Sequence, residues 1–399
     1  MKSFLRTAHL YLALASGCLL LVVCLTGCVL AFEKQLEQGL HPRRYFVAAP
    51  TRAARRPLAQ LLDSVRRHYP RQRVASLSVW TDPARTVEVG LTGVQPGGLA
   101  GKAGPGKEKK GPQGKGDGGG PRVYLNPYTA ALTGELRPER SFFHLVERIH
   151  RGLVAGPVGK QLMGLNSLAL LLSLGTGLAL GWPGSRRLAR ARLLPSWGRG
   201  WRARAYTLHV SGGLYAALLL LVLAGTGAGM AYDWVGRGIN YLTNSPAQPE
   251  KPPVSAPAAP GASPFTLDAA LTIARQRTPD ALFYRMQLPG APDGSLRVAA
   301  RRPAAPADNA TDDLYLDQYS GRILRAQAYA ERPLGQRLRG LFKPLHTGVL
   351  LGVPGQILAF LGALLGLTFP ITGTVLWLNR RRRERATKIS APAARAQVA

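Results

Sequence analysis

Acidic residues are scarce in this sequence, and charge of either sign is missing from four long stretches. Only 21 residues are Asp or Glu, against 52 Lys and Arg. The uncharged stretches are Thr7 to Phe32, Gln161 to Ser185, Ala205 to Tyr232 and Thr347 to Asn379. Each has the roughly 20 apolar residues that a bilayer-spanning helix requires. Because lipid offers no partner to backbone groups, these stretches are predicted to be helices, and a purely soluble protein is excluded.

Cysteine is equally rare. The three cysteines, Cys18, Cys24 and Cys28, all lie in the first apolar stretch. Their spacing fits neither a metal site nor a disulfide framework, and we expect them to pack as small apolar residues. The run from Leu25 to Cys28 resembles a lipoprotein cleavage box. However, Thr26-Gly27 recurs at 226–227, where no cleavage is possible, so we interpret it as part of a repeat.

Other absences narrow the function. No Gly-x-Gly-x-x-Gly turn follows a predicted strand, so the chain has no nucleotide-binding domain of its own. The four apolar stretches contain no Asp or Glu, which leaves the coupling ion of a transporter little to bind. The net charge of +31 comes without a nucleic-acid recognition motif or a basic-aromatic stripe, so nucleic acid is not predicted as a partner. Attraction to anionic lipid explains the basic loops more simply.

The basic residues near the helix ends predict the orientation, because such residues stay in the cytoplasm. Transmembrane helices are predicted at residues 7–32, 159–183, 205–232 and 349–379. Lys2 and Arg6 precede the first helix, seven arginines lie in the loop 184–204, and Arg380 to Arg383 open the tail 380–399. Both termini and this loop are therefore predicted to be cytoplasmic. Residues 33–153 and 233–345 are then extracytoplasmic, since long loops cross the membrane regardless of charge.

The chain aligns with itself, which indicates an internal duplication. A shift of 200 residues places His9 on His209 and Thr26-Gly27 on Thr226-Gly227. A shift of 196 residues superimposes a second set: His150, Gly152, Gly156, Gly159, Thr176 and Gly177 fall on His346, Gly348, Gly352, Gly355, Thr372 and Gly373. The two halves run in the same direction through the membrane, so we predict a parallel repeat about an axis along the membrane normal.

The exterior segments repeat as well. Each offers an amphipathic helix, at Pro57 to Tyr69 and at Thr266 to Gln276, followed by short alternating runs typical of strands. These runs are Val74 to Trp80, Thr86 to Gly90 and Val123 to Leu132 in the first copy, and Phe283 to Gln287, Leu296 to Ala300 and Leu314 to Leu324 in the second. The Gly- and Lys-rich insertion 98–121 and the Pro/Ala-rich linker 245–263 are predicted to be flexible. The predicted fold is a membrane all-α four-helix bundle with two small α+β extracytoplasmic domains.

Together these features resemble the PepSY-associated transmembrane family of bacterial inner-membrane proteins, also called iron-regulated membrane proteins. The resemblance rests on the histidines, the Thr-Gly elements, the His-x-Gly elements at His150 and His346, and the run from Tyr315 to Gly321. Some members are haem-containing ferric-siderophore reductases, so the resemblance implies haem chemistry and PepSY-like exterior domains. The first copy departs from the pattern at Ala130, where a turn glycine is expected.

On the predicted topology the repeated histidines form two pairs, His9 with His209 and His150 with His346. An imidazole from each of two facing helices is how a helical bundle holds a b-type haem, which gives two bis-His haem sites. Thr26 and Thr226 lie 17 residues beyond their histidines, about 25 Å along a helix. They therefore reach the opposite pair and are included as cofactor-binding residues.

Alternatives remain at each position. A single histidine at a helix end is often only interfacial, and Thr-Gly elements also mediate plain helix packing in lipid. His144, six residues before His150, is the main competitor for the exterior ligand. His41 and His68 have no predicted partner.

The leading hypothesis is a di-haem electron-transfer protein that passes electrons from a cytoplasmic or quinone donor to an extracytoplasmic ferric siderophore or other ferric chelate. The donor is a separate flavoprotein, a soluble reductant or the quinone pool. The alternative is a membrane-anchored PepSY binding or regulatory module without redox activity. A visible spectrum of the purified protein separates the two.

Overall fold

The computed structural model describes residues 2–51, 53–92, 120–194, 200–258, 261 and 263–396. The chain divides into two compact units. The first, here called the membrane unit, comprises residues 1–33, 145–243 and 338–399. The second, here called the sheet unit, comprises residues 34–144 and 244–337. The membrane unit is thus formed by three separate parts of the chain and the sheet unit by two.

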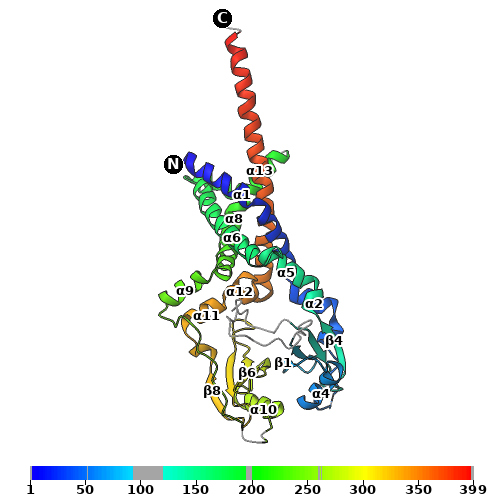
Figure 1. Cartoon of the computed structure of the whole chain (residues 1–399). Coiled ribbons are helices and arrows are strands. Elements are labelled where there is room, and N and C mark those ends of the chain that lie inside the picture. The colour runs from blue at the N-terminus through cyan, green and yellow to red at the C-terminus, as the bar shows by residue number, and fades with distance from the viewer. Residues whose placement is uncertain are drawn as a thin grey trace, which may run out of the picture. The chain divides into compact units, whose positions relative to one another are not determined.

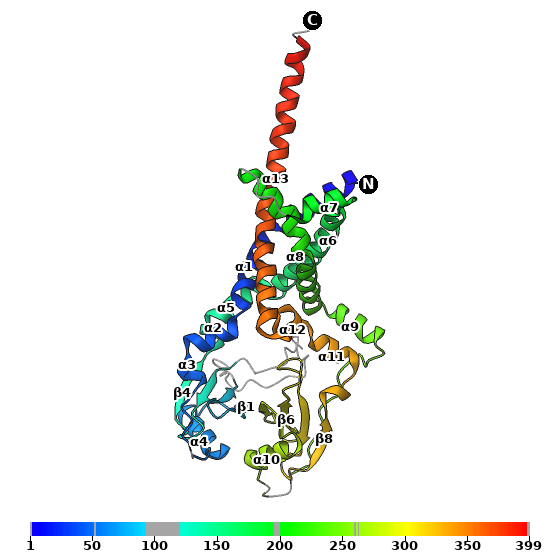
Figure 2. The ribbon, with the colours of Figure 1, turned by 180° about the vertical axis from the view of Figure 1, so that it is seen from behind.

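Four helices of the membrane unit are long and apolar enough to cross a bilayer. They are α1 (Lys2–Leu30), α6 (Gly156–Gly181), α8 (Trp201–Ala231) and α13 (Gly352–Ala396). Helix α1 packs against α6 and α13, and α8 packs against the same two helices (Figures 1 and 2). The four predicted spans are therefore present as helices, which fits a multi-pass membrane protein. Helix α13 continues beyond the predicted end at Asn379 and includes Arg380 to Arg383.

Short helices flank the spans. These are α5 (Phe142–Gly152), α7 (Arg186–Leu193), α9 (Asp233–Leu242), α11 (Leu334–Gly340), α12 (Phe342–His346) and the 3-10 turn η3 (Val349–Leu351). His150 and His346 lie on α5 and α12, the short helices that precede the second and fourth spans. The chain turns sharply after each of these histidines before the span begins. The turn after His346 uses Gly348, whose φ is +75°, a left-handed value that glycine adopts without steric cost.

Paired glycines make both turns possible. A Cβ on Gly159 would overlap the carbonyl group of Gly152, and a Cβ on Gly355 would overlap that of Gly348. The backbone of the incoming short helix therefore lies directly against the first turn of the span. This close approach gives a physical reason for the glycines that recur at a shift of 196 residues.

The sheet unit contains one antiparallel sheet of eight strands in the order β4-β3-β2-β1-β5-β6-β7-β8. The strands of the first copy are β1 (Val74–Trp80), β2 (Val87–Leu91), β3 (Arg122–Leu125) and β4 (Leu132–Leu136). Those of the second are β5 (Phe283–Gln287), β6 (Leu296–Arg301), β7 (Asp312–Leu316) and β8 (Ile323–Gln327). Strand β1 pairs with β5, with Trp80 opposite Phe283. The prediction of two separate exterior domains is therefore wrong, because backbone pairing merges the copies into one sheet.

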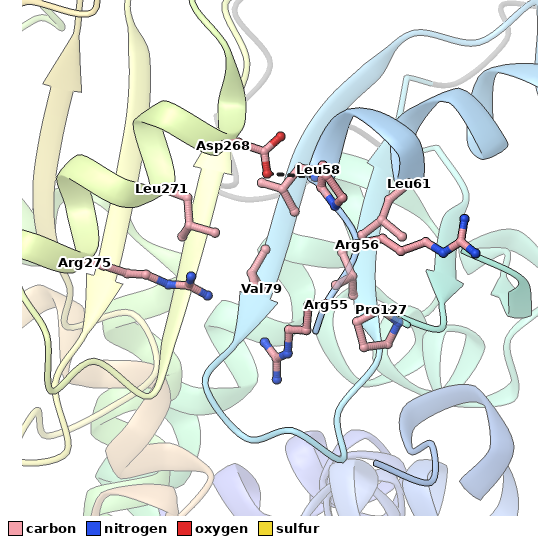
Figure 3. A pocket seen from close by; sticks show the side chains of 11 residues that line it. Arg55, Arg56, Leu58, Leu61, Val79, Pro127, Asp268, Leu271 and Arg275 are labelled. Carbon is pink, nitrogen blue, oxygen red and sulfur yellow. Dashed lines mark hydrogen bonds between the residues drawn. The ribbon is translucent and has the colours of Figure 1, made fainter. Parts of the chain in front are cut away.

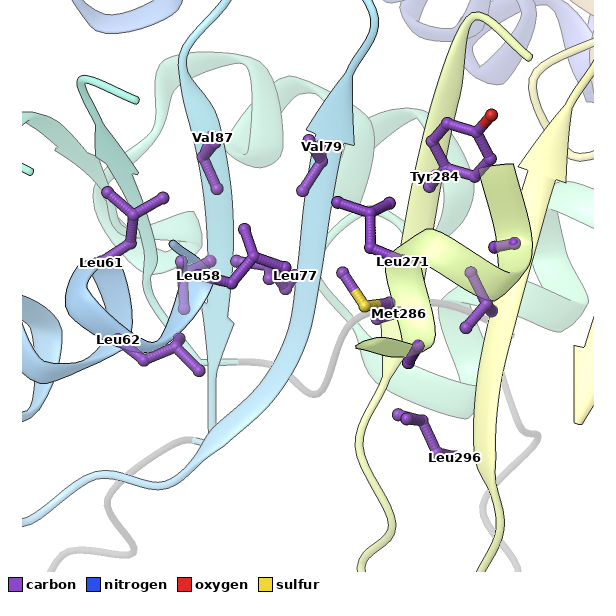
Figure 4. Close-up of a cluster of buried hydrophobic side chains, with 14 of the residues drawn as sticks. Leu58, Leu61, Leu62, Leu77, Val79, Val87, Leu271, Tyr284, Met286 and Leu296 are labelled. Carbon is purple, nitrogen blue, oxygen red and sulfur yellow. The ribbon is translucent and has the colours of Figure 1, made fainter. Parts of the chain in front are cut away.

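Helices α4 (Leu58–His68) and α10 (Leu267–Arg277) cover one face of this sheet. Alternate strand residues such as Leu77 and Met286 point to the helices and are fully buried with Leu61 and Leu271 in one continuous core (Figure 4). Each large apolar side chain buried in this way contributes about 1.5–3 kcal/mol. The same alternation sends Ser78, Trp80 and their neighbours to the other face. The remaining elements are α2 (Glu33–Leu40), α3 (Pro42–Tyr45), η1 (Pro138–Arg140) and η2 (Tyr329–Glu331).

The two predicted turn motifs adopt the same backbone conformation. Gly321 has a φ of +71° and Ala130 has a φ of +61°. The departure from the family pattern at Ala130 thus places a side chain where left-handed backbone favours glycine.

The two segments predicted to be flexible differ in how far they are described. Nearly all of the insertion 98–121 lies outside the described residues. Within the linker 245–263, the hydroxyl of Ser255 donates to the carbonyl of Gly294 at 2.8 Å, and Ala256 N–H donates to Asp317 at 2.7 Å. The linker is also held at Ser245, whose hydroxyl accepts from Gly335 N–H at 2.9 Å, and at Glu250, which forms an ion pair of 2.7 Å with Arg325. Its described part is therefore fixed to the rest of the sheet unit at several points, contrary to the prediction of flexibility.

Candidate functional site

The first histidine pair lies where the four long helices meet. The rings of His9 on α1 and His209 on α8 have their centres 6.3 Å apart. His9 Nδ1 lies 3.0 Å from the Thr176 hydroxyl and 3.1 Å from the Ser173 carbonyl, both on α6. His209 Nδ1 lies 2.9 Å from the Thr372 hydroxyl on α13. Each imidazole is therefore held by a helix other than its own.

The second pair repeats this arrangement with the other Thr-Gly elements. The ring centres of His150 and His346 are 6.0 Å apart. His150 Nδ1 lies 2.9 Å from the Thr26 hydroxyl on α1, and His346 Nδ1 lies 3.0 Å from the Thr226 hydroxyl on α8. His346 Nδ1 also lies 3.0 Å from the carbonyl of Leu223. His150, and not His144, thus forms the pair with His346.

The hydroxyl hydrogen bonds define the tautomer of all four histidines. Each threonine hydroxyl lies within 3.0 Å of the carbonyl four residues earlier in its helix, to which it donates its single proton: Thr26 to Val22, Thr176 to Leu172, Thr226 to Val222 and Thr372 to Thr368. The hydroxyl oxygen can then only accept from the imidazole, so Nδ1 carries the hydrogen. The lone pair consequently lies on Nε2, the nitrogen with which such a histidine binds a metal.

A glycine follows each threonine and lies beside the ring. An added Cβ on Gly27, Gly177, Gly227 or Gly373 would be 3.1–3.6 Å from the Cε1 atom of the adjacent histidine. At Gly177 and Gly373 this distance is 3.1–3.2 Å, so these glycines make room for the imidazoles of His9 and His209. At Gly27 and Gly227 it is 3.5–3.6 Å, an ordinary van der Waals contact.

The spacing of each pair fits two imidazoles bound to one metal ion. Two metal–nitrogen bonds of about 2.0 Å, plus about 1.1 Å from each nitrogen to its ring centre, separate the centres by about 6 Å. Among the described residues no hydrogen bond reaches any Nε2 of the four rings, and no group of three or more His, Cys, Asp or Glu could hold a metal ion alone. An ion at either pair would need further ligands from a cofactor.

Residues 6–380 match the family described as the PepSY-associated TM region. The chain belongs to this family. The match covers nearly the whole sequence, including all four spans, both histidine pairs and the eight-stranded sheet. A comparison with curated proteins finds no match.

The structure brings together more residues of this PepSY-associated protein than were predicted as its site. Of the six predicted positions, the four histidines form the two pairs and Thr26 and Thr226 bind one pair. Thr176 and Thr372, which bind the other pair, were not predicted as site residues. Their signal was in the sequence, because both open Thr-Gly elements that superimpose at a shift of 196 residues.

The sheet unit also contains a cavity of about 220 Å³ beside α4 and α10 (Figure 3). Three arginines line it, but Arg55 and Arg56 donate to the backbone carbonyls of Asp82 and Tyr128. The carboxylate of Asp268 accepts from the N–H groups of Leu58 and Ala59 at the start of α4. Two of the three arginines are therefore already used in contacts with the backbone, and the cavity contains the carboxylate of Asp268.

Proposed function

We propose that this membrane protein holds two b-type haem groups, one at each histidine pair, and transfers electrons across the membrane to a ferric chelate. The observation that carries this proposal is the repeated pairing: a threonine hydroxyl binds Nδ1 of each histidine, which leaves the Nε2 lone pair for a ligand, and the ring centres of each pair are 6.0–6.3 Å apart. A histidine packed only for structure has no need of this arrangement four times.

The donor set fits haem better than a bare ion. Each site supplies two imidazoles, and a porphyrin would supply the further nitrogen ligands that iron requires. A haem held by two such histidines would take up and pass on single electrons in preference to binding oxygen. The threonines hold each imidazole in the ligating tautomer, and a hydrogen bond to the second nitrogen raises the basicity of the ligand.

The positions of the pairs along the helices suit transmembrane transfer. Helix α1 carries His9 near one end and Thr26 near the other, 17 residues apart within Lys2–Leu30. This corresponds to about 25 Å, close to the hydrocarbon thickness of about 30 Å. One pair therefore belongs to each side of the bilayer. The donor is a quinol, a flavoprotein or a soluble reductant that loses one electron, and the chelated iron is reduced from the ferric to the ferrous state.

We further propose that the protein resides in the bacterial inner membrane with both termini cytoplasmic, and that its halves arose by duplication. The basic residues at the ends of α1, in α7 and in α13 support the orientation. The matched roles of the Thr-Gly elements in both halves support the duplication. Lys107 and Arg199, where cysteine labelling would test the orientation, lie outside the described residues.

A spectrum of the purified protein tests the proposal. We expect reduced-minus-oxidised bands of six-coordinate b-type haem and two haem groups per chain in a pyridine haemochrome assay. Dithionite-reduced protein is expected to be reoxidised by an added ferric chelate. Protein purified from haem-supplied cells without such bands would refute the proposal and favour a binding or regulatory module without redox activity.

A further inference from the structure

The sheet face opposite α4 and α10 contains a cluster of cations around two aromatic rings. Trp80 and Phe283 are paired across the β1–β5 seam, with ring centres 4.9 Å apart. Phe283 is in turn paired with Arg301 on β6. The guanidinium of Arg85 lies 4.4 Å from the Trp80 ring, and that of Arg285 lies 5.5 Å from the Phe283 ring.

Lys34 completes this cation–aromatic cluster of Lys34, Trp80, Arg85, Phe283, Arg285 and Arg301. Its ammonium lies 6.0 Å from the Trp80 ring. Asp308 neutralises part of the charge, since it forms ion pairs of 3.1 Å with both Lys34 and Arg301. Two of the four cations thus have the carboxylate of Asp308 as their direct partner.

The other two cations of the cluster, Arg85 and Arg285, do not contact Asp308. Among the described residues neither forms an ion pair. Arg85 is stacked between Trp80 and Phe46, 4.8 Å from the latter ring. Burial lowers the pKa of Arg85 below its ordinary value, and the negative charges of Asp82 and Glu88 offset part of this effect. Arg285 is fixed by a hydrogen bond of 3.2 Å from its Nε to the hydroxyl of Ser78.

Two half-buried guanidinium groups without a carboxylate are costly unless an anion binds them. Stacking on aromatic rings and the bond to Ser78 restrict both side chains, so little conformational entropy is lost when they bind a ligand. Guanidinium groups bind carboxylate-type oxygens through paired hydrogen bonds. The cluster therefore has the charge and the rigidity of an anion-binding surface.

We infer that the cation–aromatic cluster binds the acceptor of the proposed electron transfer, and that this acceptor is a negatively charged, oxygen-ligated iron(III) chelate. The identity of the ligand as an iron(III) chelate rests on the proposed function. Its negative charge is inferred from the positive charge of the cluster. Such a chelate presents several carboxylate or phenolate oxygens around its metal. Positively charged chelates are disfavoured by the same four cations.

Binding is measured without electron transfer by using gallium(III), which has the charge of iron(III) and is not reduced under these conditions. Full-length protein in detergent is dialysed against gallium(III) citrate, an anion, and against a positively charged gallium(III) trihydroxamate. We expect the citrate complex to bind and the cationic complex to bind at least tenfold more weakly. Raising the salt concentration should weaken citrate binding, because mobile ions screen the cluster.

The variants Arg85→Gln and Arg285→Gln should each weaken gallium(III) citrate binding about tenfold, since each removes a charge-assisted hydrogen bond. Arg277→Gln, at an exposed position on α10, is the matched control and should not change it. Arg85→Lys keeps the charge but loses the paired hydrogen bonds, so its affinity for gallium(III) citrate should lie between those of the wild type and Arg85→Gln. The melting temperature of each variant shows that the sheet unit is folded.

Unchanged citrate binding in folded Arg85→Gln and Arg285→Gln proteins would overturn the inference, as would an equal loss for the cationic chelate. The inference would also be overturned if Arg85→Gln and Arg285→Gln lost binding to vesicles of anionic lipid but kept their binding to gallium(III) citrate. Because gallium binding requires no haem, these results are independent of the visible spectrum that tests the proposed function.

Discussion

Removing the Thr372 hydroxyl should loosen one haem and leave the other intact. His209 Nδ1 has the Thr372 hydroxyl as its acceptor at 2.9 Å. Valine has nearly the shape of threonine but no hydroxyl, so Thr372→Val preserves packing and removes only the hydrogen bond. The Nδ1 hydrogen is then left without an acceptor inside the membrane.

The size of the effect follows from that loss. A buried donor left without its partner costs about 1–3 kcal/mol, and each 1.4 kcal/mol is about tenfold in affinity. Haem affinity at the pair of His9 and His209 should therefore fall by roughly 5- to 150-fold, the range typical of lost partners behind a metal ligand.

Thr176→Val is the matched comparison on the same pair. His9 Nδ1 keeps a second acceptor, the Ser173 carbonyl at 3.1 Å. Its imidazole remains oriented, so we expect a loss of less than about fivefold, because a typical net hydrogen bond contributes about 1 kcal/mol.

Haem loss is measured by transfer to excess apomyoglobin, which gives a dissociation rate for each haem. In Thr372→Val, one of two kinetic phases should accelerate while the second keeps its wild-type rate. If Thr176→Val and Thr372→Val accelerated haem loss equally, the Ser173 carbonyl would have no role in orienting His9. If neither did, the tautomer argument would be refuted.

Three further predictions concern the ligands and the turns. His150→Ala should remove one haem and leave the other reducible, and His9→Ala should remove the opposite one; pyridine haemochrome counts of two in both variants would mean that these histidines are not ligands. Gly321→Ala should destabilise the sheet unit by about 2–4 kcal/mol, because the left-handed backbone and overlap with Phe265 both oppose a Cβ. Ala130→Gly should instead stabilise it by up to about 1 kcal/mol. Chemical denaturation measures both changes in the free energy of unfolding, and two changes in the same direction would contradict the argument. Asp317 has its pKa lowered to about 2, chiefly by the Ser320 N–H, so its stabilising contribution is present above the unfolded pKa of about 3.9 and is lost as pH falls towards 2. Asp317→Asn should therefore flatten the acid side of the melting-temperature profile, and an unchanged profile would refute this role.

The sequence predicts the parts of the fold that depend on local periodicity. Strands β1 and β5 have the predicted bounds, Val74–Trp80 and Phe283–Gln287. Helix α4 differs from its prediction by one residue at each end. Uncharged stretches of about 20 residues identify the spans because the cost of a charge in lipid is large. These features are encoded within single segments.

Features that depend on contacts between distant segments were missed. The pairing of Trp80 with Phe283 merges the two copies into one sheet, and nothing in either strand alone encodes that partner. The separation of His150 from its span depends on the close approach of Gly159 to the carbonyl of Gly152. In the sequence, these glycines are visible only as a repeat.

The structure gives the threonines a contact that the sequence does not reveal. The hydroxyl of Thr26 binds both its own helix backbone and His150 Nδ1. The threonine therefore orients the imidazole of His150. Spacing alone predicts the level of Thr26 in the membrane, whereas the direction of its hydroxyl proton depends on the helix carbonyl beside it.

The distribution of these elements links the two sites through shared helices. Helix α1 carries His9 of one pair and Thr26, which binds His150 of the other, and α8 likewise carries His209 and Thr226. The two pairs therefore depend on the same two helices along their whole length. The distance along each helix from its histidine to its Thr-Gly element therefore determines how far apart the two pairs lie. This explains why that distance is 17 residues in both halves.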